Sequence, residues 1–343
     1  MPPKKGAAKK TAKPKAAKPA GKARKQADAP KEEAIAEEPT MISGKGKDEA
    51  PADAKPDGKP SKKRKNAAES DEPQKAARRS GRGTAKSQPS QQQLLNYMLS
   101  TDAEELCRPE DESADIHERG DIRTYSSSAL NPFEELLCAV VLSRPISHRL
   151  GLRSIRTILN EPYSFISAKA VQDAGSEKHH QALWEARTQH KAKTAENIGH
   201  IGDVVLSKFT ASDDKEGTQL QKVRDDCEQD VSKERDYLQA NIKGLGKTGL
   251  DIFFRRVQWL WTEAYPFVDE RTMHALHKLG LPEAGEELIE VIEEHWSTLN
   301  TKQLAGDDEA ARKRRALVTI LERATGSDLE GKHEALGDAA ATC

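Results

Sequence analysis

The chain has 343 residues, and its 55 Lys+Arg residues nearly balance its 56 Asp+Glu residues. That balance hides an asymmetry: residues 1–90 hold 24 basic and 12 acidic residues, and residues 91–343 hold the remaining 31 and 44, so the net charge changes from +12 to −13. Four separated cysteines without a CxxC pair argue against a disulfide framework and against an iron–sulfur cluster. No apolar run matches a membrane span or a signal peptide, so we expect a soluble intracellular protein.

Residues 1–90 contain no Phe, Tyr or Trp and are rich in Ala, Lys, Pro, Gly and Ser. Such a segment buries too little apolar surface to offset its ordering entropy, so we expect a long disordered basic tail. A compact basic cluster follows Pro60 and predicts a nuclear import signal and a nuclear location: Lys62, Lys63, Arg64 and Lys65. The alternative for this cluster is a solvated charge run. Flexible lysines also bind polyanions by counterion release, so the tail is expected to help hold DNA or chromatin.

We interpret the rest of the chain as largely helical and divide it into three parts. Residues 91–124 are expected to be a linker with a short helix, residues 125–330 a helical domain, and residues 331–343 a disordered C-terminus. The clearest helix is 133–142, with Asn131 as N-cap and Pro132 in its first position. Further helices are expected at 147–159, 165–174, 181–201, before 238, and at 250–261, 272–279, 283–296 and 307–323. Alternating β-branched stretches are nearly missing, so the fold class is predicted to be all-α.

A glycine-containing turn at residues 241–250 is the strongest candidate for a binding site. Gly244 and Gly246 permit a tight turn and keep side chains away from an approaching ligand, and Lys247 and Thr248 open the next helix. The amides at a helix start point outward and favour an anion, so the turn is suited to binding phosphate. The alternative is an ordinary turn between two helices, with glycine as C-cap. Rossmann and Walker patterns are absent.

Five motifs occur here in the order found in one family: 131–137 (NPFEELL), 143–145 (SRP), 191–198 (KAKTAENI), the turn at 242–249 and 268–269 (VD). Over about residues 125–325 the chain resembles the helix–hairpin–helix DNA glycosylase superfamily, which includes endonuclease III and the thymine mismatch glycosylases. The resemblance implies a monomer with a two-lobed helical fold, a cleft for a flipped base, and a hairpin that clamps double-stranded DNA, often with a monovalent cation. The implied hairpin contacts are Lys243, Gly244, Leu245, Gly246, Lys247 and Thr248.

The resemblance places the catalytic carboxylate of the family on Asp269, where it would stabilise the positively charged sugar formed as the glycosidic bond breaks. The alternative for Asp269 is a plain N-cap of the next helix. Bifunctional members have a Schiff-base lysine where this chain has Thr248, and a hydroxyl cannot form an imine, so no β-lyase activity is expected. Arg144 lies where relatives insert a side chain into the base stack, although a surface arginine is the alternative.

Two functions follow from these residues. The first is a monofunctional DNA glycosylase of base excision repair without a bound cofactor, and the second is an inactive glycosylase-like module that binds DNA or chromatin. No metal site is expected, because His179, His180 and His190 lack partners at a recognisable spacing and read as surface residues. Trp259, Trp261 and Trp296 are expected in the core.

Overall fold

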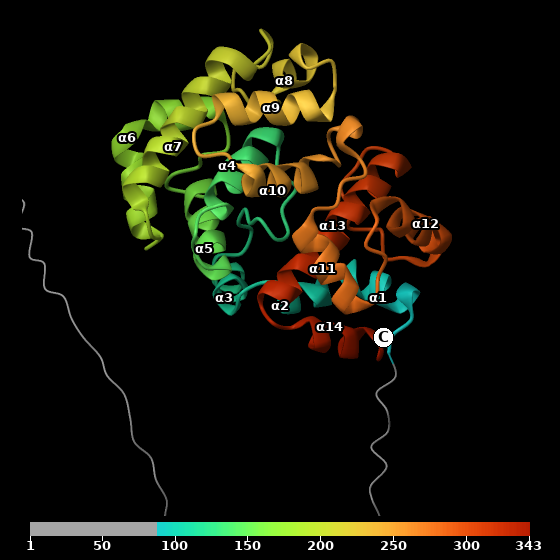
Figure 1. Ribbon diagram of the computed structural model, residues 1–343. Coiled ribbons are helices and arrows are strands. Elements are labelled where there is room, and N and C mark those ends of the chain that lie inside the picture. The colour runs from blue at the N-terminus through green and yellow to red at the C-terminus, as the bar shows by residue number, and fades with distance from the viewer. Residues whose placement is uncertain (1–87) are drawn as a thin grey trace, which may run out of the picture. The chain divides into compact units, whose positions relative to one another are not determined.

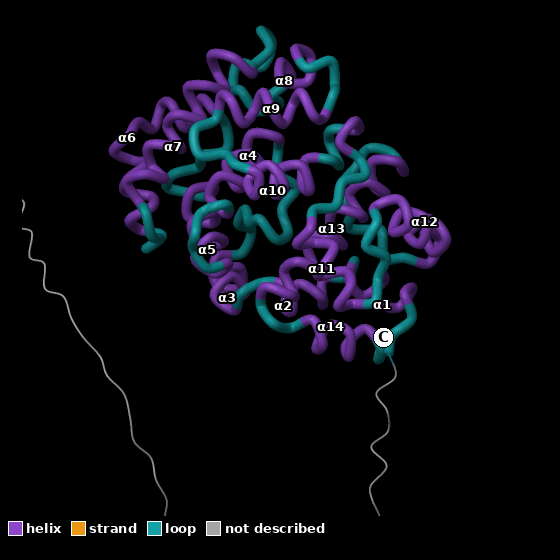
Figure 2. Tube along the Cα trace, in the orientation of Figure 1, coloured by secondary structure: helices purple, strands orange, loops and turns teal. Residues whose placement is uncertain are grey.

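A computed structural model describes residues 88–343, so the predicted tail and its import signal at residues 62–65 lie outside the described part of the chain. Every regular element within residues 88–343 is helical, which confirms the all-α class (Figures 1 and 2). The α-helices are α1 (Gln91–Met98), α2 (Glu104–Cys107), α3 (Glu110–Arg119), α4 (Pro132–Leu142), α5 (His148–Leu159), α6 (Ala168–Glu185), α7 (Lys191–Val204), α8 (Gln221–Asp226), α9 (Val231–Asn241), α10 (Lys247–Val257), α11 (Glu270–Leu279), α12 (Gly285–His295), α13 (Glu309–Leu329) and α14 (His333–Ala340). Short 3₁₀ turns lie at Thr101–Ala103, Thr262–Ala264 and Trp296–Thr298, and a π turn lies at Val205–Phe209.

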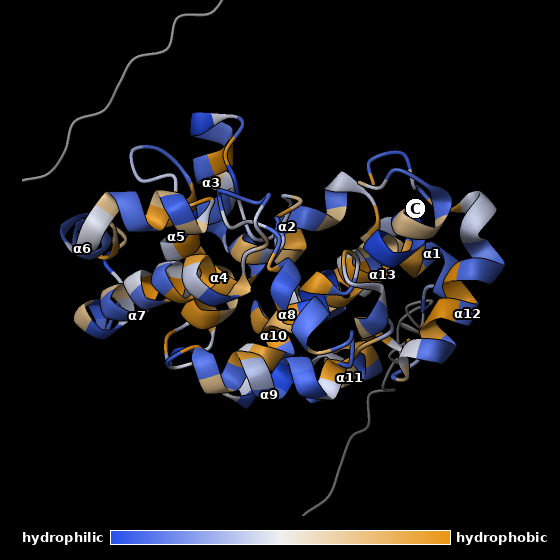
Figure 3. Cartoon of the chain, turned by 90° about the horizontal axis from the view of Figure 1, so that it is seen from above, coloured by the Kyte–Doolittle hydropathy of each residue, from blue (hydrophilic) through white to orange (hydrophobic). Residues whose placement is uncertain are grey.

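Helix α4 forms as its sequence predicts. The Asn131 side chain accepts a hydrogen bond from the Glu134 amide, the Glu134 carboxylate accepts one from the Asn131 amide, and Pro132 occupies the first turn. These contacts satisfy amides that a helix start leaves unpaired. The apolar side chains of α4 are almost completely buried, and α10 packs against it (Figure 3 shows the hydrophobic residues along both helices).

The buried apolar residues form two clusters. The first core is built from residues between Tyr125 and Ala264, which belong to α4 through α10 and their connections. The second core combines residues 94–107 with residues 275–340, so helices from both ends of the described chain share it. In Figure 1 the helices of the second core, α1, α2 and α11 to α14, gather on one side of α10 and those of the first core on the other.

Residues 91–124 differ from the expected linker. Helix α1 buries Leu95 and Met98 completely in the second core. The acidic stretch at residues 110–115 belongs to α3, and three of its carboxylates bind Arg156 of α5. Arg156 is only 1% exposed. The Arg156 guanidinium donates hydrogen bonds to three carboxylates, at 3.1 Å to Asp111, 2.7 Å to Glu112 and 2.8 Å to Asp115. This pairing offsets part of the negative charge of α3 and fixes α3 to the first core.

The C-terminus also differs from expectation, because residues 333–340 form α14 and bury Leu336 and Ala340 in the second core. The predicted helix boundaries near residue 175 shift as well. Helix α6 continues past Gly175, which takes a positive φ of 75° and kinks it. No helix within residues 88–343 is long and apolar enough to cross a membrane.

The expected burial of aromatic and histidine side chains is only partly right. Trp261 is 1% exposed and lies in the first core, whereas Trp259 and Trp296 are only partly buried. His179 is buried, not on the surface, and its Nε2 lies 2.8 Å from the Val171 carbonyl oxygen. A polar ring with one backbone partner is compatible with a core position.

One buried carboxyl group lies beside a second carboxyl group. Glu234 of α9 is fully buried, and it lies near Glu263, whose carboxylate is paired with Arg224. Burial and then the charge of Glu263 raise the pKa of Glu234 to about 7. The folded chain therefore keeps a proton on Glu234 at pH values where the unfolded chain has lost it.

Replacement of Gly326 is expected to disrupt the second core. A methyl group on Gly326 of α13 would lie 2.2 Å from the carbonyl oxygen of Cys107 in α2, so Gly326→Ala should lower the free energy of unfolding by about 1–3 kcal/mol in urea titrations. The matched control is Gly337→Ala in α14, where a methyl group meets nothing within 4 Å. Gly337→Ala should raise stability by up to about 1 kcal/mol, and an equal effect of both changes would contradict the packing described.

The contribution of Glu234 to the free energy of unfolding should fall as pH rises from about 5 to about 8, because Glu234 must lose its proton in a buried site. A carboxyl group with a raised pKa in the folded state favours folding below its ordinary pKa of 4.5, and this contribution is lost as pH rises to about 7. Glu234→Gln should flatten this dependence and be more stable than the wild type at about pH 8, by about 1–3 kcal/mol in urea titrations. A variant with an unchanged pH profile would rule out this role for Glu234.

Candidate functional site

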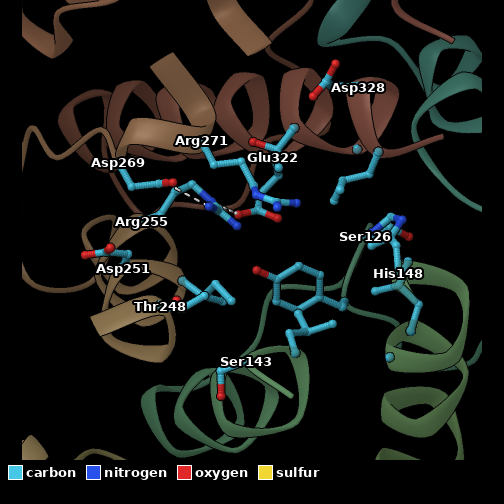
Figure 4. A pocket seen from close by; sticks show the side chains of 18 of the residues that line it. Ser126, Ser143, His148, Thr248, Asp251, Arg255, Asp269, Arg271, Glu322 and Asp328 are labelled. Atoms are coloured by element: carbon cyan, nitrogen blue, oxygen red, sulfur yellow. Dashed lines mark hydrogen bonds and ion pairs between the residues drawn. The ribbon is translucent and has the colours of Figure 1, made fainter. Parts of the chain in front are cut away.

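A cavity of about 860 Å³ lies where residues of both cores meet. Its walls come from the end of α4, from α5 and α10, from the start of α11 and from the C-terminal half of α13. Figure 4 shows Thr248 and Asp251 on one side, Asp269, Arg255 and Glu322 on another, and Ser126 and His148 opposite. The residues that line the cavity include Arg144, Lys247, Thr248, Arg255, Asp269 and Glu322.

The glycine turn connects α9 to α10 and leaves the start of α10 open. Gly246 is the N-cap residue of α10 and supplies no side chain to bond its first amides. Leu245 is 3% exposed and belongs to the first core, so only its backbone is available to a ligand. Lys247 and Thr248 are exposed. The unpaired amides and the positive end of the helix dipole therefore face solvent beside a lysine, which suits an anion.

The two glycines of the turn have different environments. Gly244 has a φ of 87°, and a Cβ atom there would lie 2.6 Å from Nδ2 of Asn197 and 2.7 Å from Nη2 of Arg144. Gly246 has an ordinary φ of −106°, and a Cβ atom there would meet nothing within 4 Å. The fold requires a glycine at 244, whereas the packing within residues 88–343 gives no reason for one at 246.

Arg144 lies against the turn. Its Nε and Nη2 atoms are covered and have no hydrogen-bond partner among the described residues, and both polar atoms of Asn197 are in the same state. Burial lowers the pKa of the Arg144 guanidinium. In this arrangement Arg144 supports Gly244 and also lines the cavity.

Asp269 is the N-cap residue of α11, as the simpler interpretation of the sequence requires. Its Oδ1 accepts a hydrogen bond from the Thr272 amide at 3.3 Å, and its Oδ2 accepts one from the Thr272 hydroxyl at 2.7 Å. Oδ2 also accepts from Nη1 of Arg255 at 2.8 Å. The residue is 7% exposed and lines the cavity.

Arg255 keeps Asp269 ionised. Burial alone would raise the pKa of Asp269, but the Arg255 charge and the hydrogen bonds of Arg255 and Thr272 outweigh it, so this pKa is below its ordinary value. Arg255 in turn donates from Nε to Oε1 of Glu322 in α13 at 2.6 Å. The buried Asp269–Arg255–Glu322 group therefore pairs one guanidinium with two carboxylates.

The glycine turn and the start of α11 lie close together beside the cavity. Lys247 Nζ lies 3.8 Å from Glu270, the residue after Asp269, and both side chains are exposed. Lys243 forms a 2.7 Å ion pair with Glu196 of α7. The structure thus brings together Asp269, Lys247 and Thr248, while it leaves Lys243 on the outer side of the turn beside α7.

Two other kinds of chemistry find no support here. Cys107 lines the cavity, but burial raises the pKa of its thiol to about 12, so the thiol stays protonated and is a poor nucleophile. Among residues 88–343, no group of three or more His, Cys, Asp or Glu side chains could hold a metal ion.

The sequence analysis missed Arg255 and Glu322. The adjacent arginines in the apolar stretch 253–257 (FFRRV) were the available signal, because charged residues inside a core helix are normally paired. No protein-family model, curated protein or solved structure matches the chain, so the family resemblance is based on its motifs alone.

Alanine substitutions at the two glycines should separate folding from binding. Gly244→Ala is expected to lower the free energy of unfolding by about 1–3 kcal/mol, because the new methyl group meets Asn197 and Arg144 at positive φ. Gly246→Ala should stay within about 0.5 kcal/mol of the wild type. Urea titrations of both variants test this, and a strong destabilisation by Gly246→Ala would contradict the open environment described.

Proposed function

We propose that this chain is a monofunctional DNA glycosylase of base excision repair. The observation that supports this most strongly is that an ionised, positioned carboxylate and the uncapped start of a helix line one cavity. The α10 amides and Lys247 would bind a phosphate of double-stranded DNA, and a damaged or mispaired base would be rotated into the cavity. Extrusion is necessary because the glycosidic bond is inaccessible in a stacked duplex, and mispaired bases cost least to extrude.

Asp269 would act on the sugar. As the bond between C1′ and the base nitrogen breaks, the base leaves with the electron pair and the sugar becomes positively charged. The Asp269 carboxylate stabilises that charge and orients a water molecule, whose oxygen bonds to C1′. The proton of that water goes to Asp269 and then to solvent, and the departed base anion takes up a proton from solvent. Arg255 and Thr272 would hold the carboxylate in place, and Arg255 would keep it ionised.

Thr248 lines the cavity in the place where bifunctional relatives have a Schiff-base lysine. Its hydroxyl cannot form an imine, so the product would be an intact strand with an abasic site. In this proposal the two hydrophobic cores are the two lobes of a helix–hairpin–helix fold, the carbonyls of the turn hold a monovalent cation, and the protein is a monomer. The basic tail would direct it to the nucleus and add weak contacts to DNA or chromatin.

An inactive DNA- or chromatin-binding module is the second candidate. Its support is that Asp269 already has a complete structural role, as N-cap of α11 and as partner of Arg255. The net charge of −13 over residues 91–343 opposes tight general binding to DNA in either candidate. The two candidates differ in whether any glycosidic bond is cleaved.

The test is single-turnover incubation with duplexes that contain uracil, thymine opposite guanine, oxidised purines or alkylated purines, followed by alkali. At least one lesion should give strand breaks after alkali but none before it. Asp269→Asn should slow the reaction by about 100-fold or more, because the amide retains the capping oxygen but lacks the charge. Circular dichroism melting must show that the variant is folded.

Two further variants make the result decisive. Gly246→Val adds a side chain at the start of α10, and its Cβ atom would meet nothing within 4 Å. This change should weaken duplex binding in fluorescence anisotropy, whereas Asp269→Asn should not. Duplex binding without breaks from any lesion would favour the module. Breaks that persist in a folded Asp269→Asn variant would contradict the assigned role of Asp269.

A further inference from the structure

The junction of α6 and α7 presents an exposed indole that the cavity does not use. Trp184, near the end of α6, is 74% exposed, about twice the exposure of the next large hydrophobic residues, Leu329 at 38% and Ile166 at 36%. A single exposed apolar residue needs no explanation on its own. Here, however, the ammonium group of Lys191, the first residue of α7, lies 4.8 Å from the centroid of the indole ring. The indole is therefore oriented by a cation and is open to solvent.

The surroundings of Trp184 are basic, although residues 91–343 are acidic as a whole. Residues 178–193 contain four Lys or Arg residues and a single acid, Glu185. The Glu185 carboxylate accepts a hydrogen bond from the Tyr163 hydroxyl at 2.7 Å. Arg187 is exposed at the junction, and Arg153 of α5 donates from Nε to the Ala186 carbonyl at 2.9 Å. This local basic charge attracts a polyanion. Because the indole adds a flat apolar face, the surface suits a polyanion that also carries flat apolar groups better than it suits an acidic protein surface.

Helix α7 connects this surface to the glycine turn. Glu196, five residues after Lys191, is ion-paired with Lys243 of the turn, and Asn197 lies beside Gly244. At about 1.5 Å per residue, the start of α7 is about 7–8 Å along the helix axis from Glu196. That distance is about two nucleotide steps at about 3.4 Å per step along a strand. Figure 1 shows α6 and α7 side by side, so their junction is presented at one end of this pair.

We propose that Trp184, Lys191 and Arg187 form a stacking site for an unpaired nucleotide of a DNA strand, separate from the cavity. Aromatic side chains among cations are the usual means of binding single strands, because every base has a face that can stack and every nucleotide has a phosphate. Among residues 88–343 the exposed indole has no exposed apolar helix face around it, which does not fit membrane insertion. This site shares with the proposed function only the premise that the chain binds DNA, and it does not depend on cleavage of a glycosidic bond.

The test measures binding of the full chain to a fluorescein-labelled oligothymidylate and to a duplex of equal length, by anisotropy. Trp184→Ala should weaken oligothymidylate binding by roughly 5-fold to 100-fold and duplex binding by less than about 2-fold. The basic tail is present in every variant, so its contribution cancels in the comparison. The matched control is Ile166→Ala, which removes an exposed apolar side chain elsewhere and should leave both affinities unchanged.

Two further readouts report the site itself. Oligothymidylate should quench the tryptophan fluorescence of the wild type, and Trp184→Ala should abolish most of that quenching. Lys191→Gln should lower the slope of log affinity against log salt by about 0.7 for the single strand. Melting temperatures should be close to the wild type, since the altered side chains lie at the surface.

The outcomes separate this proposal from the proposed enzymatic function. If the wild type fails to bind oligothymidylate, or if Trp184→Ala binds and quenches like the wild type, the stacking site is wrong even when a lesion is excised. If quenching depends on Trp184 and no lesion is excised, the stacking site stands and the glycosylase proposal does not.

Discussion

The buried group formed by Asp269, Arg255 and Glu322 determines how the two cores meet. Arg255 comes from α10 of the first core, whereas Glu322 comes from α13, which packs in the second, and Asp269 starts α11. Buried charges lose hydration, and only good geometry with further hydrogen bonds compensates for that loss. Here Thr272 supplies the additional donors to Asp269. Removal of Arg255 would leave two buried carboxylates without their shared cation, so this group constrains the relative position of three helices.

The same constraint gives the cavity its chemical character. Helix α10 has its uncapped start and Lys247 at one end and Arg255 near the other, so the helix that would bind phosphate also fixes the carboxylate. A second arginine of α10, Arg256, is paired with Glu135 of α4 at 2.9 Å, which holds the helix to the first core. An acidic side chain this close to a phosphate site would repel DNA if it were unpaired. The pairing with Arg255 reduces that repulsion while it preserves the ionised form.

Local features of the sequence predicted local features of the structure. The capping box of α4, the turn that ends at α10 and the N-cap at Asp269 all depend on residues within a few positions of one another. The errors involve partners far apart in the chain. Residues 91–124 look like a linker because their acids seem unpaired, yet Arg156 meets those acids from 41 to 45 positions away.

The exposure of individual side chains was the other property that the spacing of apolar residues could not predict. Trp184 lies in the helix expected at 181–201, but α6 ends at Glu185 and the Trp184 side chain is 74% exposed. Glu322 is 67 positions from Arg255, and nothing in the sequence pairs the two. The sequence therefore predicted the turn and the catalytic candidate, whereas the residues that position that candidate required the structure.

The most direct measurement is an experimental structure of the folded Asp269→Asn variant bound to a duplex with a tetrahydrofuran abasic-site analogue, which requires no knowledge of the excised base. A phosphate on the amides that follow Gly246, with the sugar analogue inside the cavity and its C1′ position beside residue 269, is the predicted result. DNA bound away from the glycine turn, or a sugar analogue that stays outside the cavity, would contradict the account.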